Sequence, residues 1–518
     1  MLFNSYGFIF LFLPVVLLGF FRLARIHHAY SAAWLAASSL FFYGYWNPAY
    51  VGLLLISIVC NYAFGMWIGK AGYGMRDTGY GMRDAGYGIR DTGYKSGARR
   101  VSKKQMLTLA IAANLLLLGY YKYANFFLSS IDTVTGSTWQ IGDIMLPLGI
   151  SFFTFTQIAF LVDTYQGKVK EYNFIHYLLF VTYFPHLIAG PVLHHKDMMP
   201  QFAHQATYRI NWDNVATGLL LFTLGLCKKT LWADSLAPFA TAIFDGTQHG
   251  MAIGMLPTVY EAWSGALAYT LQIYFDFSGY TDMALGIALM FNIRLPINFN
   301  SPYQSTSIID FWRRWHITLS AFLRDYLYIP LGGNRHGKPR RYINLLATML
   351  LGGLWHGAGW TFVIWGALHG VYLTLNHLWR ELVAEKYLRW IPVWLGALTG
   401  GTITFIAVVA AWVVFRSIDM AQAITLLKAM FGIAARPISF DAVQHGNLLL
   451  VTDMSGRDLL RLLAPGLLWV WLLPNSAHVR FIKANVLLTL VQAVVVLYML
   501  FVVIDQFGSY SPFLYFQF

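Results

Sequence analysis

Charged residues are scarce in this chain, and hydrophobic residues are abundant. Only 11% of the 518 residues are Asp, Glu, Lys or Arg, whereas 57% are hydrophobic and 17% are aromatic. Because soluble globular proteins carry about 25% charged residues, this composition excludes a soluble domain and predicts an all-α polytopic membrane protein. The formal net charge of +13 fits Lys and Arg held in cytoplasmic loops better than it fits a nucleic-acid partner, so we expect no nucleic acid.

Cysteine is rare, and several catalytic motifs are missing. Cys60 and Cys227 both lie inside apolar runs, where they cannot build an extracellular disulfide framework. The sequence contains no HExxH, GxSxG or GxxxxGKS/T motif, which argues against a zinc protease, a serine hydrolase and a P-loop enzyme. The adjacent His194 and His195 begin a loop in which we expect them to be solvated, so no metal site is predicted.

Long apolar runs dominate what is present. The first, from Gly7 to Phe21, has no basic residue before it and Arg22 and Arg25 after it, so it is interpreted as a first span with its N-terminus outside rather than as a cleaved signal. The runs 30–46 and 49–68 are separated by an Asn-Pro turn and predict a helical hairpin. Further runs lie near 105–121, 144–163, 174–192, 214–232, 254–275, 278–292, 342–378, 393–415, 462–474 and 484–505.

Several of these runs are shorter than the roughly 20 residues that a spanning helix needs. We therefore predict about ten to twelve true spans, with re-entrant and horizontal helices among them. Residues 420–434 have apolar positions at helical spacing and one lysine, which is typical of an interfacial helix. No linker separates a soluble part, so residues 1–518 are interpreted as a single integral-membrane domain.

The segment 69–104 is a basic loop with an internal repeat. It holds nine Lys and Arg residues against three Asp residues, as expected for a cytoplasmic loop. Within it GYGMRDT, GYGMRDA and GYGIRDT follow one another from Gly72, Gly79 and Gly86. Two glycines in each unit argue against a coiled coil and favour a low-complexity insert, although a role in binding anionic lipid or a partner stays open.

Polar chemistry concentrates in the stretch FWRRWHITLSAFLRDYLYIPLGGNR, residues 311–335. Bulky residues recur every three or four positions from Ile308 to Tyr328, which predicts one amphipathic helix. His316 falls beside the apolar stripe, and Ser320, four residues on, shares its side of that helix. We therefore expect His316 to point into the protein.

A second histidine follows in LWHGAGWTF, residues 354–362. If a span begins near Tyr342, His356 lies roughly 21 Å along it, past the middle of the membrane, and Gly357 and Gly359 loosen the backbone after it. Desolvation there favours a neutral imidazole, which is a competent base. The alternative is a purely structural role, in which His316 and His356 only satisfy hydrogen bonds between packed helices.

Several ordered stretches give this sequence a specific resemblance. They are LPLGISFFTFTQIAFLVDTYQG (146–167), FPHLIAGPVLHH (184–195), GLCKKTLWADSLAP (225–238), YFDFSGYTDMALGIALMFNIRLPINFNSPY (274–303), DFWRRWHITLSAFLRDYLYIPLGGNR (310–335) and LWHGAGWTFVIWGALHG (354–370). Together they resemble the membrane-bound O-acyltransferase (MBOAT) family, and within it the alginate O-acetyltransferase branch. The resemblance implies a helix-walled tunnel open to the cytoplasm, where acetyl-CoA presents its thioester as donor substrate, with no permanently bound cofactor.

The resemblance also implies roles for particular residues. His356 is expected to be the catalytic histidine and general base, with His316 as the second active-site histidine. Arg313, Arg314, Arg324 and Arg335, with Ser320, are candidates for binding the coenzyme A phosphates, or else the arginines anchor a horizontal helix. Asp276, Asp282 and Asp310 are candidate supporting residues that orient the histidines or lock helices together.

The chain ends in SPFLYFQF. Such an aromatic tail can anchor at the membrane interface. Similar endings in the resembling branch have been proposed to offer a tyrosine hydroxyl as an acyl relay, so Tyr515 is a candidate to carry acetyl toward an extracytoplasmic acceptor.

The expected function is that of a bacterial inner-membrane acetyltransferase that moves acetyl outward for O-acetylation of an exported polysaccharide. Alginate is the first expected polymer, followed by cellulose and peptidoglycan, and the resemblance implies periplasmic SGNH-type partners together with polysaccharide synthesis and export proteins. One alternative is D-alanylation of teichoic acid from a carrier-protein thioester. The other is a transporter or export component without enzymatic activity, although the halves of the chain show no matching hydropathy.

Overall fold

The computed structural model describes residues 1–71, 102–137, 139, 141–142, 144–169, 173–252, 256–384, 392–437, 456–479, 486–505 and 513–514. Across these ranges the regular structure is helical, with no strand, which confirms the predicted all-α fold. The GYG repeat, which begins at Gly72, and Tyr515 lie outside the described residues.

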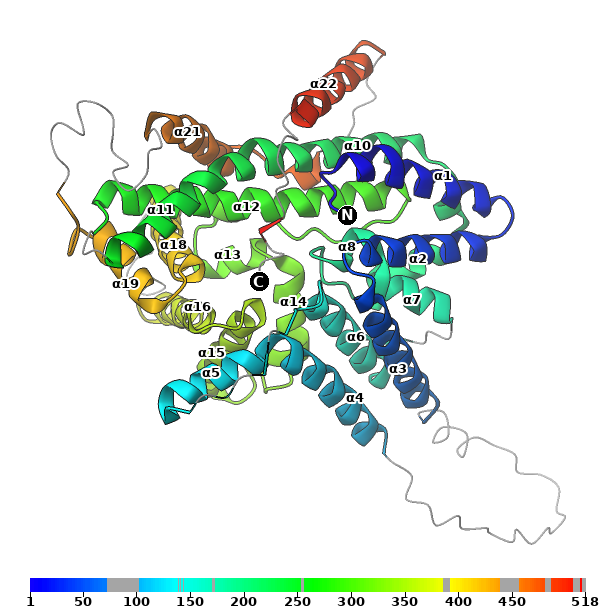
Figure 1. Ribbon diagram of the computed structural model, residues 1–518, viewed down its shortest axis with the longest axis horizontal. Coiled ribbons are helices and arrows are strands. Elements are labelled where there is room, and N and C mark those ends of the chain that lie inside the picture. Colours follow the sequence, from blue (N-terminus) through cyan, green and yellow to red (C-terminus); the bar gives the residue numbers. More distant parts are fainter. Residues whose placement is uncertain are drawn as a thin grey trace, which may run out of the picture.

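In the first part of the chain, α3, α4 and α7 pack on α6, while α1 lies along α2 (Figure 1). Ser102 caps α4 reciprocally with Gln105. The two helices predicted on either side of the Asn-Pro turn are present as α2 and α3, but they do not form the expected hairpin, because α2 packs mainly against α1 and α7 while α3 runs away from it (Figure 1). The helices of this part are α1 (Leu13–Ala24), α2 (His28–Gly44), α3 (Ala49–Ala71), α4 (Lys103–Leu118), α5 (Ala124–Thr135), α6 (Ile150–Tyr165), α7 (Phe174–Thr182), α8 (Phe184–Leu187) and α9 (His195–Met198).

The second part is built on α12, a 32-residue helix that crosses the whole molecule and is buried along most of its length (Figure 1). Around it lie α10 (Trp212–Cys227), α11 (Asp234–Ala252), α12 itself (Val259–Met290), α13 (Ile308–Arg314), α14 (Ile317–Leu323), α15 (Gly337–His356), α16 (Trp360–Trp379), α18 (Val393–Arg416), α19 (Met420–Met430), α21 (Gly456–Leu472) and α22 (Val486–Asp505).

Glycines bring α10 and α12 into backbone contact. Gly218 and Gly225 on α10 meet Gly286 and Gly279 on α12, and a Cβ added at Gly225 would lie 2.4 Å from the Gly279 carbonyl oxygen. Small residues at a membrane helix interface allow this close approach. The seven-residue spacing of both glycine pairs is visible in the sequence.

Short π-helical turns interrupt several helices and carry polar residues. The turn Gly119–Tyr123 joins α4 to α5 and contains Lys122, and the turn Lys228–Ala233 joins α10 to α11 and contains Lys228 and Lys229. Such insertions re-aim side chains and are frequent at functional sites. Further π-helical turns are Gly7–Phe12, Arg324–Tyr328 and Arg380–Ala384, and short 3₁₀ turns are Met199–Ala203, Gln205–Tyr208, Pro302–Gln304 and Ser476–His478.

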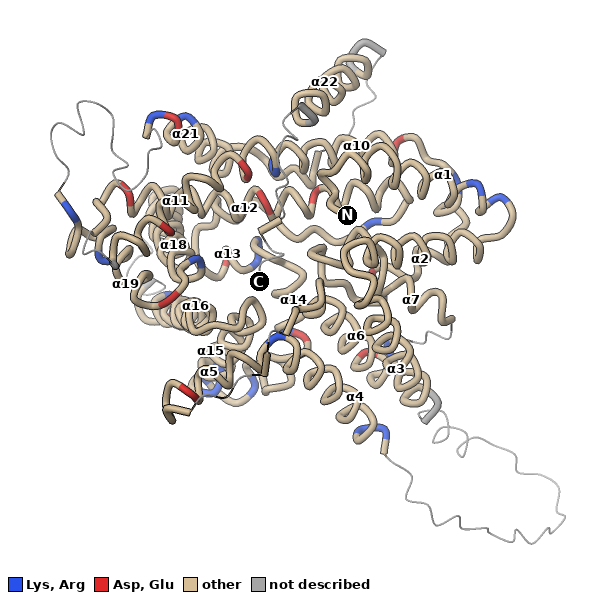
Figure 2. Tube along the Cα trace, in the orientation of Figure 1, with Lys and Arg blue, Asp and Glu red and all other residues tan. Residues whose placement is uncertain are grey.

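The outer surface suits a lipid environment. Large apolar side chains such as Leu11, Phe41 and Leu116 are more than half exposed, and Figure 2 shows few charged residues along most helices, with basic residues at the end of α1 and the start of α4. Within the described ranges, five helical segments are long and apolar enough to span a membrane: Gly7–Ala24, Ala49–Gly69, Lys103–Thr135, Trp212–Met251 and Val393–Arg416. The protein is thus a multi-pass membrane protein, and ten to twelve spans stays a prediction.

One helix that we expected to be continuous is divided in two. The amphipathic helix predicted from Ile308 to Tyr328 is broken at His316, between α13 and α14, because the His316 backbone is left-handed. The apolar stripe on either side is present, since Phe311, Trp315 and Phe322 are buried. The spacing of the apolar residues therefore identified the buried face. It could not reveal the break at His316, because apolar residues are buried on both sides of that break.

Two further elements can be compared with expectation. The run 342–378 forms two helices, with α15 beginning five residues earlier than expected, at Gly337. The helix expected within 420–434 is α19, whose Ala423, Leu426 and Ala429 are buried, and its position at the membrane interface stays a prediction.

Candidate active site

His316 is placed by an unusual backbone. Its φ of 44° lies in the left-handed region that residues other than glycine rarely adopt. The neighbouring Ile317 N–H donates to the Asn298 carbonyl oxygen at 2.9 Å. The side chain is fully buried, so the break between α13 and α14 directs an imidazole into the protein interior.

Asn298 sets which ring nitrogen of His316 holds the proton. The Asn298 Oδ1 lies 3.2 Å from His316 Nδ1 and also accepts hydrogen bonds from the Thr318 backbone N–H and hydroxyl, at 3.2 and 2.9 Å. Two donors on the same oxygen identify it as the amide carbonyl, which accepts only. His316 therefore donates from Nδ1 and keeps its lone pair on Nε2.

His356 is the last residue of α15. Gly357 follows with an extended backbone, and α16 begins at Trp360, so the expected loosening at the glycines is where the helix ends. The two helices touch backbone to backbone at Gly353 and Gly366, because a Cβ at Gly366 would lie 2.3 Å from the Met349 carbonyl oxygen. The turn that carries His356 is thus held tightly.

The carbonyl end of α15 is capped by the π-helical turn that contains Lys122. The Lys122 ammonium donates to the Trp355 and His356 carbonyl oxygens at 2.6 and 3.1 Å, and the Tyr123 hydroxyl donates to the Leu354 carbonyl oxygen at 2.8 Å. Cations at a helix C-terminus satisfy its last carbonyls and favour its dipole. Lys122 therefore fixes the backbone from which the His356 ring projects.

The two histidines meet inside an aromatic enclosure. Their ring centroids are 6.2 Å apart, and the His356 ring packs against Trp355, Trp365 and Phe415 at 5.0 to 5.6 Å between centroids. His356 is only 6% exposed. One reacting group between the rings can lie within hydrogen-bond reach of both.

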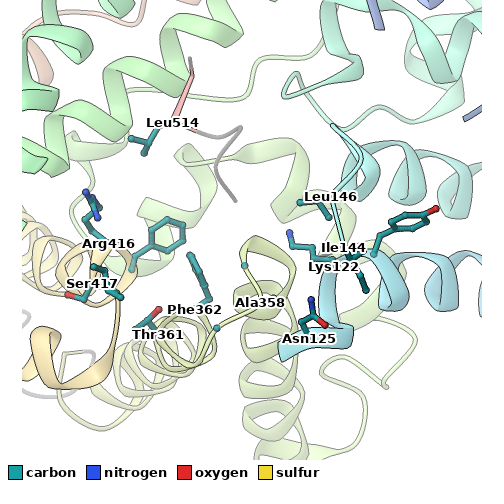
Figure 3. A pocket seen from close by; sticks show the side chains of 15 residues that line it. Lys122, Asn125, Ile144, Leu146, Ala358, Thr361, Phe362, Arg416, Ser417 and Leu514 are labelled. Atoms are coloured by element: carbon teal, nitrogen blue, oxygen red, sulfur yellow. The ribbon is translucent and has the colours of Figure 1, made fainter. Parts of the chain in front are cut away.

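A cavity of about 510 Å³ opens beside this pair (Figure 3). Lys122 and Leu146 line one side and Arg416 and Ser417 another, and Leu514 lies on the same side as Arg416. The lining residues are Tyr121, Lys122, Asn125, Ile144, Leu146, Gly357, Ala358, Gly359, Thr361, Phe362, Phe415, Arg416, Ser417, Ile418 and Leu514. A smaller cavity of about 100 Å³ shares Lys122 and Leu146 and reaches Trp355.

Residues 149–413 match the model of the membrane-bound O-acyltransferase family. The matched region contains both histidines and covers just over half of the chain. The chain belongs to the membrane-bound O-acyltransferase family. The resemblance predicted from the motifs is confirmed, and the protein is a membrane O-acetyltransferase of this type.

Curated relatives agree with this assignment. A peptidoglycan O-acetyltransferase of Helicobacter pylori is 39% identical over all of this chain and 98% of its own length. A probable alginate O-acetylase of Azotobacter vinelandii is 42% identical over 83% of this chain and 78% of its own length. A teichoic acid D-alanyltransferase of Bacillus subtilis is 28% identical over 47% of this chain.

The predicted arginines of this acyltransferase are bonded to carboxylates or exposed. Arg314 donates to Asp310 at 3.0 Å, and Arg324 donates to Asp325 at 2.7 Å. Arg313 and Arg335 are exposed. The structure thus does not bring the four together around the two rings, and Asp310 serves as the ion-pair partner of Arg314.

Ser320 lies four residues after His316, and its hydroxyl faces the backbone of Trp315. Its hydroxyl lies 3.4 Å from the Trp315 carbonyl oxygen, while its backbone N–H bonds to the His316 carbonyl. Both of these contacts are to backbone atoms and do not place Ser320 between the two imidazoles.

Asp276 and Asp282 are both buried and bonded to lysines. Asp276 accepts from Lys229 and Asp282 from Lys228, each at 2.7 Å. These ion pairs join α12 to the π-helical turn after α10. Neither carboxylate hydrogen-bonds to a histidine in the described part of the chain, so their position fits the helix-locking alternative rather than histidine orientation.

His195 is buried and His194 is mostly buried, contrary to the expectation that both are solvated. His194 Nδ1 lies 2.8 Å from the Tyr326 hydroxyl, which itself bonds to Asp163, and His195 is packed beside Phe180. The wrong expectation came from reading a histidine pair at a loop start as exposed.

Several residues of the site were not predicted. Lys122, Tyr123, Asn298 and Thr318 support the two histidines, yet they come from segments far away in the sequence. Lys122 had a signal, because it directly follows the apolar run 105–121, and a lysine at such a place in a membrane helix is energetically costly and is by default a functional candidate.

Proposed function

We propose that the protein transfers acetyl from cytoplasmic acetyl-CoA, through the histidine pair, toward an extracytoplasmic polysaccharide. The observation that carries the proposal is the burial of His316 and His356 with ring centroids 6.2 Å apart, next to a cavity that is lined by Gly357 and Phe415. In this scheme the neutral His356 is the general base that takes the proton of the acceptor hydroxyl. His316, with its lone pair on Nε2, positions the reacting group.

The direction of transfer follows from helix alternation. Basic residues occur where α1 ends and where α4 and α15 begin, and the positive-inside rule puts those ends in the cytoplasm. The 510 Å³ cavity is lined by residues at the opposite level, among them Gly357 after the end of α15, Leu146 before α6, and Ser417 after the end of α18. The cavity is therefore the acceptor side in this proposal, the N-terminus is outside, and the membrane is the bacterial inner membrane.

The thioester arrives from the opposite, basic side. Arg324 and Arg335, which are exposed close to the start of α15, remain the candidates for contact with the coenzyme A phosphates, as do Arg313 and Arg314 on α13. An arginine already bonded to a carboxylate must exchange that partner for phosphate, so the exposed Arg335 is the first of the four to test.

The acceptor is proposed to be a cell-envelope glycan. Sequence motifs alone put alginate before cellulose and peptidoglycan, but the peptidoglycan O-acetyltransferase matches this chain along nearly its whole length, which moves peptidoglycan to the front. Tyr515 is proposed to relay the acetyl group, and a periplasmic SGNH-type protein to complete the transfer to sugar.

The experiment uses the purified full-length protein in proteoliposomes with acetyl-CoA labelled in the acetyl group. We expect release or transfer of acetyl by the wild-type protein without any carrier protein, and a loss of about 10²- to 10⁴-fold in kcat for His356→Ala and His316→Ala. Melting temperatures establish that each variant is folded.

The same assay separates the alternatives. Transfer that requires a carrier-protein thioester would identify a D-alanyl-type donor, in keeping with the weaker similarity to teichoic acid D-alanyltransferases. Wild-type rates in both folded histidine variants would refute the catalytic assignment and favour a transporter.

A further inference from the structure

The end of the chain returns to the middle of the molecule. The short segment Phe513–Leu514 lies beneath α12 (Figure 1), and Phe513 is 1% exposed. The Leu514 side chain lines the 510 Å³ cavity together with Phe362 and Phe415 (Figure 3). Leu514 is thus part of the wall of the proposed acceptor cavity, and its neighbour Phe513 is buried beside it.

A buried ion pair holds this segment. The Leu514 backbone N–H donates to Asp276 Oδ2 at 2.9 Å, while Asp276 Oδ1 accepts from Lys229 at 2.7 Å. The Lys229 ammonium also lies 4.8 Å from the centre of the Phe513 ring, and that ring meets Tyr280 edge to face at 4.7 Å. Both members of one ion pair therefore contact the segment, one by a hydrogen bond and one by a cation–π contact.

The same piece of α12 reaches the histidine site. Phe277, next to Asp276, packs against the His316 ring at 4.8 Å between centroids. Because consecutive Cα atoms are about 3.8 Å apart, whatever fixes Leu514 limits where Tyr515 can go. The Asp276–Lys229 pair is thus linked on one side to the tail and on the other to the catalytic enclosure.

We propose that Asp276 and Lys229 form a seat for the segment Phe513–Leu514. This seat fixes the position of Leu514 in the wall of the acceptor cavity. Asp276 and Lys229 are positioning residues, and the inference rests on the proposed transfer of acetyl through Tyr515. Asp276 is the central member, since it holds both the backbone of the tail and the ammonium beneath its ring.

The chain contains a matched control for this seat. Lys228 and Asp282 form a neighbouring ion pair of the same length, also buried, between the same two elements. Its further partner is Ser476, at 2.7 Å from Lys228 and 2.6 Å from Asp282. When Asp276 is removed, Lys229 keeps Asp234 as a partner. When Asp282 is removed, Lys228 keeps Ser476 as an acceptor.

The test places a reporter on the tail. Leu514→Cys is introduced into the full chain with Cys60 and Cys227 changed to serine, and its labelling rate by a water-soluble maleimide is measured. Asp276→Ala is expected to raise that rate about tenfold, whereas Asp282→Ala leaves it within about twofold. Asp276→Asn, which keeps an oxygen for the Leu514 N–H, is expected to stay close to the parent. Equal rates in the two alanine variants would overturn the seat.

Acetyl transfer is then measured with Leu514 restored. Asp276→Ala is expected to lower kcat at least tenfold with little change in the KM for acetyl-CoA, and Asp276→Asn to recover most of it. An unchanged kcat in a protein whose tail is released would overturn the positioning role. Failure of the proposed function is distinguishable, because the wild-type protein would then transfer no acetyl while the labelling difference remained.

Discussion

The His316 backbone is left-handed, and this conformation explains how a histidine comes to face another one across an enclosure of tryptophan and phenylalanine rings. Such a conformation in a residue other than glycine costs of order 1–3 kcal/mol and persists only where neighbours hold it. Asn298 does so with both its backbone and its side chain.

Asn298 is therefore predicted to matter for rate. Asn298→Ala removes the acceptor of the His316 Nδ1 proton, so the tautomer is no longer fixed, and we expect kcat to fall tenfold or more at nearly constant KM. Thr318→Val is the control, because it removes another donor to the same oxygen while leaving the histidine bond; we expect less than a threefold change. Equal losses in the two variants would contradict the role given to Asn298.

At the scale of elements, contacts between helix backbones hold the site. Lys122 caps the carbonyl end of α15, glycines join α15 to α16, and a second glycine set joins α10 to α12. These contacts combine residues from distant segments, and each tolerates little change.

Loss of the α15 cap is predicted to move His356. Lys122→Met leaves the Trp355 and His356 carbonyl oxygens without their donor, which costs about 1–3 kcal/mol when such groups are buried. We expect a lower melting temperature in detergent and a loss of activity well below that temperature. Tyr123→Phe, which removes a single bond to Leu354, should be milder on both measurements, and a reversed order would refute the cap.

The glycine contact between α10 and α12 gives a prediction about stability alone. Gly225→Ala brings a Cβ against the backbone of α12 and should destabilise the protein by about 1–3 kcal/mol. Gly396→Ala on α18 meets nothing within 4 Å, and we expect it to leave the melting temperature unchanged or raise it. Comparable melting temperatures for the two variants would contradict the close contact.

At the scale of the whole molecule, the proposed catalytic residues His316 and His356 lie in the region that matches the family, and the GYG repeat lies outside it. Deletion of residues 72–92, which removes the three repeats, is predicted to leave acetyl transfer within about twofold of wild type. The measurement is kcat in proteoliposomes, and a tenfold loss would show that the insert takes part in function.

Much of this organisation follows from sequence because membranes impose simple rules. Apolar runs located the helices, and a titratable residue in an apolar setting pointed to His316 and His356. Local patterns could not show that the helix breaks at His316, since its apolar stripe continues on both sides. They also could not pair Lys122 with α15 or Asp276 with the tail, because these contacts join residues more than 200 positions apart.

The most direct test of the account is sided transfer in proteoliposomes of known orientation, with labelled acetyl-CoA supplied on one face and a glycan acceptor on the other. We predict labelled acceptor only when acetyl-CoA meets the face that bears Arg335 and the acceptor meets the cavity face, and none with folded His316→Ala or His356→Ala protein. Equal labelling from both orientations, or wild-type labelling by either histidine variant, would contradict transfer through the histidine pair.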